Sequence, residues 1–71
     1  MIDLLAHITI KAISMTYNDL LRLLEKEGFD LIDIAVHGEG FIYCNCRHKR
    51  FPHTREYVAV DSEKNVVIAP R

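Results

Sequence analysis

A basic stretch in the second half of the chain holds the residue types that could contact a ligand. Residues 47–55 contain four Arg or Lys residues and two histidines, with no acidic residue among them. On an extended strand, Phe41 and Tyr43 would share a side with Arg47, because side chains alternate across a strand. Rings stack on unpaired bases and cations neutralise phosphates, so the segment 41–55 predicts a nucleic-acid-binding surface. Its expected contact residues are Phe41, Tyr43, Arg47, Lys49, Arg50, His53 and Arg55.

The same stretch is open to other interpretations. No RRM, KH, cold-shock or helix-turn-helix signature accompanies it. Its cations could instead contact an acidic protein partner, or could simply keep an edge strand from aggregating. The second functional hypothesis is therefore a small regulatory or inhibitory protein-interaction module that pairs through a sheet edge, with a homodimer as one form.

A set of zinc-type ligands overlaps this stretch, since Cys44, Cys46, His48 and His53 have the spacing C-x-C-x-H-x4-H. Tetrahedral zinc sites usually hold two cysteines on a turn, with two to four residues between them. Alternate residues of a flat strand lie about 6.6 Å apart, which is too far for two thiolates on one ion. Ile42 and the two cysteines would equally form the buried side of a strand. We therefore expect free thiols, no metal and no cofactor, in the reducing cytoplasm.

Hydrolytic chemistry is the third hypothesis, in the form of an RNase-like hydrolase. Each of the four histidines could act as a general base near neutral pH, with Asp33 or Glu39 as its partner. None of the serine-hydrolase, zinc-protease, P-loop or dinucleotide-binding motifs is present. The chain is accordingly expected to be non-catalytic, with His37 and His53 as the candidates if it does hydrolyse a substrate.

The elements that would position these residues include one strongly marked helix at 17–27. Thr16 can cap it, because its hydroxyl can accept from the backbone N–H of Asp19, and the two residues match a capping box. Apolar residues recur at helical spacing through the segment. Gly28 then fits the left-handed position that ends a helix, and Phe29 would pack back on the last turn.

This helix and its glycine stop, residues 18–29, resemble the opening helix of HicA-type mRNA-cleaving toxins. Proteins of that family follow the helix with a β-hairpin and a further strand. They carry a histidine just after a Gly-Ser step as the second strand begins, whereas the matching stretch here, residues 38–43, has glycine at that position. The preceding strand is also longer here, and an extra strand precedes the helix. What the resemblance implies is an RNA-facing sheet, with no catalytic residue carried over.

Strands are predicted on both sides of the helix, because apolar and polar residues alternate with a period of two. The expected strands are 2–13, 31–37, 41–50, 57–61 and 66–69. Turns are expected at 37–40 and 62–65, and Pro52 predicts a loop at 51–54.

The fold class that follows is α+β, as a single domain over residues 1–71. It has two layers, one helix on a small and mainly antiparallel sheet, in the order β-α-β-β-β-β. One helix covers only one face of such a sheet, so the other must meet solvent, a second copy or a partner. Tyr57 and Phe29 are expected in the core or at its rim. The helix should bury Tyr17, Leu20, Leu21 and Leu24 against Ile8, Ile10, Ile32, Ile34, Val58, Val60 and Ile68.

The net charge of −1 hides an uneven distribution. Residues 1–46 carry three basic and seven acidic residues, whereas residues 47–71 carry six basic and three acidic residues. Such asymmetry can mark an interaction face. The apolar run over residues 1–13 is broken by Asp3, His7 and Lys11, so neither a signal peptide nor a membrane partner is expected, and the cytoplasm is the predicted location.

Overall fold

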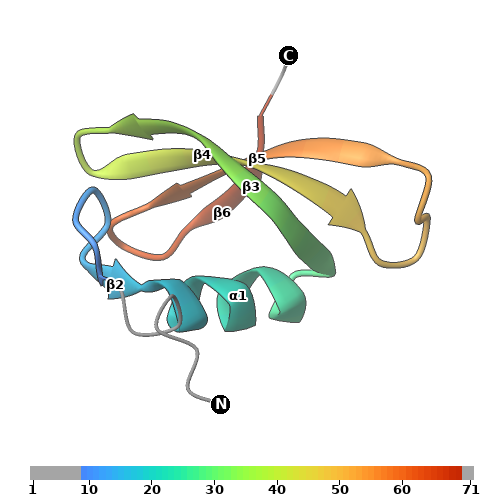
Figure 1. The fold of residues 1–71 in the computed structure, drawn as a ribbon, viewed down its shortest axis with the longest axis horizontal. Helices are drawn as coiled ribbons and strands as arrows, with labels where there is room; N and C mark the ends of the chain where they lie inside the picture. Colours follow the sequence, from blue (N-terminus) through green and yellow to red (C-terminus); the bar gives the residue numbers. More distant parts are fainter. Residues whose placement is uncertain (1–8, 70–71) are drawn as a thin grey trace.

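The computed structural model describes residues 9–69, in which one helix packs on a four-stranded antiparallel sheet (Figure 1). Strands β3 to β6 follow one another across this sheet, and the short strands β1 and β2 pair separately. The α+β class and the order of the helix and main strands are therefore confirmed. The elements are β1 (Thr9–Ile10), β2 (Met15–Thr16), α1 (Tyr17–Lys26), β3 (Phe29–Gly38), β4 (Phe41–His48), β5 (Arg55–Asp61) and β6 (Val66–Ile68).

Helix α1 begins and ends where its capping residues predict. The backbone N–H of Asp19 donates to Thr16 Oγ1 at 3.1 Å, which satisfies one of the orphan donors of the first turn. The Asp19 carboxylate bonds Arg22 at 3.0 Å, so only the threonine half of the capping box forms. Gly28 has φ +92°, the left-handed conformation that stops the helix, and its N–H bonds Glu25 O at 3.0 Å. The last helical residue is Lys26, one residue before the predicted end.

The apolar face of α1 covers one face of the sheet. Leu20 and Leu24 are fully buried, and Tyr17 packs at the edge of the same cluster. The sheet contributes alternate residues of β4 and β5, as the period of two predicts. The buried core consists of Ile10, Ile13, Met15, Leu20, Leu24, Phe29, Ile42, Cys44, Cys46, Val58 and Val60.

Three predicted core residues lie outside the core. Leu21 on α1 is only half-buried and is not part of the core cluster. The other two belong to edge strands. Ile32 is 38% exposed because β3 has a register shift there, so the extra residue leaves the alternation with β4. A second shift falls at Ala35. Ile68 is 55% exposed because it lies in the edge strand β6, beyond the cover of the helix. Ile8 lies outside the described residues.

The long N-terminal strand predicted over 2–13 is also wrong where the structure describes it. Only Thr9 and Ile10 are extended, and they pair with β2 rather than with the main sheet. Residues 11–14 form a tight turn in which Ile13 N–H bonds Ile10 O at 3.2 Å. The turn brings Ile10, Ile13 and Met15 into the core together, which a straight strand would not do. Residues 2–8 of the prediction lie outside the described part of the chain.

The two hairpins around the candidate site form close to their predicted positions. The β3–β4 turn is Glu39-Gly40, with Gly40 at φ +75°, and the β5–β6 turn spans 62–65. The β4–β5 loop spans 49–54, longer than predicted, because β4 ends at His48. No helix within residues 9–69 is long and apolar enough to cross a membrane.

Candidate nucleic-acid interface

The face of the sheet opposite α1 is covered by no helix or strand of residues 9–69 (Figure 1). We call it the open face. In β4, the residues that point to α1 are buried while the alternate residues Phe41, Tyr43 and Asn45 stay half-exposed and Arg47 is exposed. The cross-strand registers place further residues of β3, β5 and β6 beside them. The open face consists of Asp30, Asp33, Val36, Gly38, Phe41, Tyr43, Asn45, Arg47, Arg55, Tyr57, Ala59, Asp61 and Val67.

Three aromatic rings form a row at one end of the open face. The Phe41 and Tyr43 rings meet edge to face, with centroids 5.2 Å apart and planes at 70°. The Tyr43 and Tyr57 rings stack, with centroids 5.0 Å apart and planes at 13°. Tyr57 lies opposite Asn45, so it is the diagonal neighbour of Tyr43, a separation that aromatic side chains bridge. Phe41 also covers Gly38 on β3, where a Cβ atom would overlap its ring.

Tyr57 is the member of this row that the sequence interpretation missed. It was expected in the core or at its rim, yet it lies with the two predicted stacking rings. The signal was present in β5, where Val58 and Val60 mark the buried side. Tyr57 directly precedes Val58, so it points to the face opposite the buried one and could have been assigned from periodicity.

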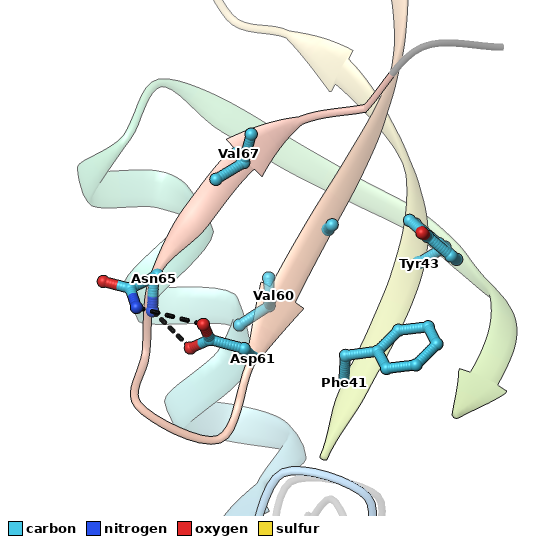
Figure 2. Close-up of a pocket in the computed structure, with 7 residues that line it drawn as sticks. Phe41, Tyr43, Val60, Asp61, Asn65 and Val67 are labelled. Atoms are coloured by element: carbon cyan, nitrogen blue, oxygen red, sulfur yellow. Dashed lines mark hydrogen bonds between the residues drawn. The ribbon is translucent and has the colours of Figure 1, made fainter. Parts of the chain in front are cut away.

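A shallow hollow of about 200 Å³ lies beside the rings and extends to β6 (Figure 2). Asp61 on its rim accepts hydrogen bonds from the Asn65 N–H at 2.9 Å and from Asn65 Nδ2 at 3.0 Å. These bonds favour the carboxylate and lower the pKa of Asp61. The rim therefore carries a negative charge at neutral pH. The lining residues are Phe41, Tyr43, Ala59, Val60, Asp61, Asn65 and Val67.

The other end of the open face is basic, and two of its cations are direct neighbours. Arg47 and Arg55 lie opposite each other on β4 and β5, and both are exposed. His48 N–H bonds Thr54 O at 3.1 Å, so the hydrogen-bonded pairs of this ladder fall on the even residues of β4. The two arginines therefore form a non-hydrogen-bonded pair, the kind whose side chains approach most closely. Like charges in direct opposition destabilise a sheet.

One predicted contact residue forms an ion pair with an acidic residue, whereas the two arginines form none in the described part of the chain, although Asp30 lies opposite Arg47. Lys49 Nζ bonds Asp30 Oδ1 at 2.9 Å, and this hydrogen bond raises the pKa of Lys49. Asn45 Nδ2 donates to Asp33 Oδ1 at 2.7 Å, which occupies a second carboxylate between the rings and the arginines. Within residues 9–69, no ion pair engages Arg47 or Arg55. Of the four predicted cations, Lys49 is therefore the one that an acidic side chain pairs with directly.

Arg50 and His53 lie in the loop that joins β4 to β5 directly beyond the arginine pair, and both are exposed. His48 anchors this loop from the helix side of the sheet. Its ring contacts Phe29 at 5.5 Å and Phe51 at 5.0 Å between centroids, and its Nδ1 accepts the Arg50 N–H at 3.2 Å. This nitrogen is therefore occupied by a backbone contact rather than directed at the cysteines.

The cysteines have the buried arrangement that was one of their two interpretations. Cys44 and Cys46 are fully buried against α1 and form no disulfide. Burial, with smaller contributions from neighbouring charges, raises the pKa of Cys44 to about 12 and that of Cys46 to about 11. Both thiols are thus protonated at neutral pH, whereas zinc binds the thiolate. Within residues 9–69, no three His, Cys, Asp or Glu side chains are grouped to hold a metal.

The structure does not assemble the predicted hydrolytic partners. His37 is exposed near the end of β3, opposite Ile42, and His53 lies in the 49–54 loop. Among the described residues, no hydrogen bond or ion pair joins either histidine to a carboxylate. Asp33, one proposed partner, is bonded to Asn45 instead.

Comparison with protein-family models, with curated proteins and with solved structures found no match for this chain.

Proposed function

We propose that the open face binds single-stranded nucleic acid, with its rings against the bases and its arginine pair on the phosphate backbone. The observation that supports this most directly is the Arg47–Arg55 pair, two cations that form no ion pair within residues 9–69 and lie opposite each other on the open face. A phosphate between the two guanidinium groups would replace repulsion with charge-assisted hydrogen bonds. The cost of the pair to folding is thereby offset when the ligand is bound.

The arrangement of rings and cations supports an unpaired strand as the ligand. Phe41 and Arg47 are six residues apart on β4, so the two ends of the site are about 20 Å apart. Base faces are available for stacking only where the strand is unpaired. Within residues 9–69, the open face has no projecting helix with which to enter a groove. Bases would lie along the rings while the backbone continues to the arginines and the 49–54 loop.

The test measures the fluorescence anisotropy of short labelled oligonucleotides, single- and double-stranded, DNA and RNA, over a salt series. We expect the single strands to bind more tightly and the affinity to fall steeply with salt. Arg47→Gln and Arg55→Gln should each lower the slope of log affinity against log salt by about one. Arg22→Gln on α1 is the matched control, since it removes an exposed arginine on the other side of the molecule.

Substitutions of Tyr43 test the contribution of the aromatic rings separately from that of the arginines. Tyr43→Ala should weaken binding by about 1–3 kcal/mol, the usual contribution of one stacked base, while Tyr43→Phe should retain most of the affinity. The proposal fails if no oligonucleotide binds at low salt. It also fails if Arg22→Gln weakens binding as much as the open-face variants do.

A further inference from the structure

The two edges of the sheet differ in how they are protected against pairing with another strand. β3 carries two register shifts, at Ile32 and Ala35, together with Asp30 and Asp33. Bulges and charges are the usual means by which an edge strand resists association. β6 carries neither, since Val66–Ile68 pair with β5 in unbroken register and contain no charge. Val67 and Ile68 are 60% and 55% exposed, so the unprotected edge is also apolar.

The hydrogen bonds of β6 show which of its backbone groups are free. Ala69 N–H donates to Tyr57 O at 2.6 Å, and Asp61 N–H donates to Asn65 O at 3.2 Å. In an antiparallel ladder the bonded pairs alternate, so the odd residues of this segment face β5. Val66 and Ile68 therefore direct their N–H and C=O groups away from the sheet. No other strand of residues 9–69 pairs with that edge.

We infer that β6 pairs antiparallel with β6 of a second copy of the chain, about a two-fold axis at Val67. This register sets Val66 of one copy opposite Ile68 of the other. Both are residues with outward backbone groups, so each free N–H and C=O of the strand finds a partner. The strand is thus complementary to itself, as an isologous interface requires.

Two features favour a second copy over a different partner. The strand is uncharged, so two copies meet without like-charge repulsion. The axis also brings Val67 of each copy together on the open face, where each lines the apolar hollow beside Phe41 and Ala59 (Figure 2). The exposed valines would then cover each other. Arg47 and Arg55 lie outside the 58–60 segment that pairs with β6, so the interface leaves the arginine pair free.

The dimer should be weak, because a three-residue strand makes a small interface. Sedimentation equilibrium of the full chain without nucleic acid should show a mass that rises with concentration, in the micromolar range, from 8.2 kDa toward that of a dimer. Ile68→Pro removes an outward N–H that β5 does not use, and it should leave a folded monomer. Ile68→Val keeps the donor and should still dimerise. Circular dichroism checks that each variant is folded.

A charged residue at position 67, on the two-fold axis, gives a second test that does not require a proline substitution. Val67→Lys alone and Val67→Glu alone should each be monomeric, because each meets its own charge across the two-fold. Mixed together, they should form a heterodimer that salt weakens. A wild-type chain that stays monomeric at high micromolar concentration would overturn the inference, and so would dimerisation of Ile68→Pro equal to that of Ile68→Val. Failure of the mixture to associate would overturn the register. Oligonucleotide binding is measured separately, so either proposal can fail alone.

Discussion

Asp61 shows how one side chain shapes the rim of the site. It accepts hydrogen bonds from the backbone N–H groups of Glu63 and Asn65, both at 2.9 Å, as well as from the Asn65 amide. These bonds hold the β5–β6 turn, in which Lys64 adopts the left-handed φ of +69° that L-residues rarely take. The carboxylate thus compensates a strained backbone position by satisfying the donors around it.

Asp61 should make the stability of the protein depend on pH at the acid end. Its pKa is lowered in the folded state from the ordinary value of 3.8, so it stabilises the fold above that pH. The stabilisation is lost as the pH falls through the folded pKa. Urea denaturation over an acidic pH series should show a smaller loss of stability in Asp61→Asn than in the wild type. Equal slopes for the two proteins would contradict this role of the turn.

The buried cysteines should be unreactive in the folded protein. Cys44 and Cys46 have no exposed surface, and their raised pKa values keep the reactive thiolate scarce. A thiol reagent at pH 8 should label neither residue in native protein and both in denaturant, as mass spectrometry would show. Since each folded pKa lies above the ordinary 9.0, stability should also decline as the pH rises beyond about 9. Rapid native labelling would show that this part of the core opens.

At the scale of elements, α1 owes its position to local signals at its two ends. Thr16 satisfies a first-turn donor, and Gly28 reverses the chain so that Phe29 enters the core. Both involve hydrogen bonds between residues three apart in the sequence, so they do not depend on how the sheet strands pair. Strand β3 is the opposite case, because its register shifts depend on its pairing with β4.

Removal of the helix cap should cost a measurable part of the stability. Thr16→Ala loses the acceptor for the Asp19 N–H and should lower the free energy of unfolding by about 1 kcal/mol. Thr16→Ser keeps a hydroxyl at the same position and is the control, expected to stay close to wild type. Chemical denaturation followed by circular dichroism measures both. If the serine variant lost as much as the alanine variant, the pairing of Thr16 with Thr9, rather than the cap, would be responsible.

At the scale of the whole molecule, the one helix of residues 9–69 covers only one face of the four-stranded sheet. The covered face collects the apolar core, and the open face collects the aromatic row and the arginine pair. Stability and binding should therefore trade against each other on the open face. Repulsion between Arg47 and Arg55 weakens the free protein, while the same charges attract an anionic strand.

Arg55→Gln should separate these two effects. Loss of the like-charge pair should raise the free energy of unfolding by roughly 0.2–1 kcal/mol at low salt, whereas oligonucleotide affinity should fall. The stability gain should shrink at high salt, because screening already reduces the repulsion in the wild type. Denaturation at two salt concentrations and anisotropy on the same samples give both values. A less stable Arg55→Gln would mean that Arg55 has a structural contact that outweighs the repulsion.

Much of the local structure follows from neighbouring residues in the chain. The cap at Thr16, the stop at Gly28 and the alternating burial of β4 depend on interactions within a few residues, and each was predictable. The candidate contact residues Phe41, Tyr43 and Arg47 were also assigned to one side of one strand from their spacing. That strand does carry all three on the open face.

Pairing between strands determined the features that could not be predicted, because it brings together residues that are far apart in the sequence. The extra residues in β3 exposed Ile32, Tyr57 joined the aromatic row through its diagonal contact with Tyr43, and Asp30 neutralised Lys49. The same register set Arg47 against Arg55. Sequence periodicity indicates which face of a strand a residue occupies. Which residue stands opposite it, and hence which charges and rings meet, is fixed only when the strands align in the folded sheet.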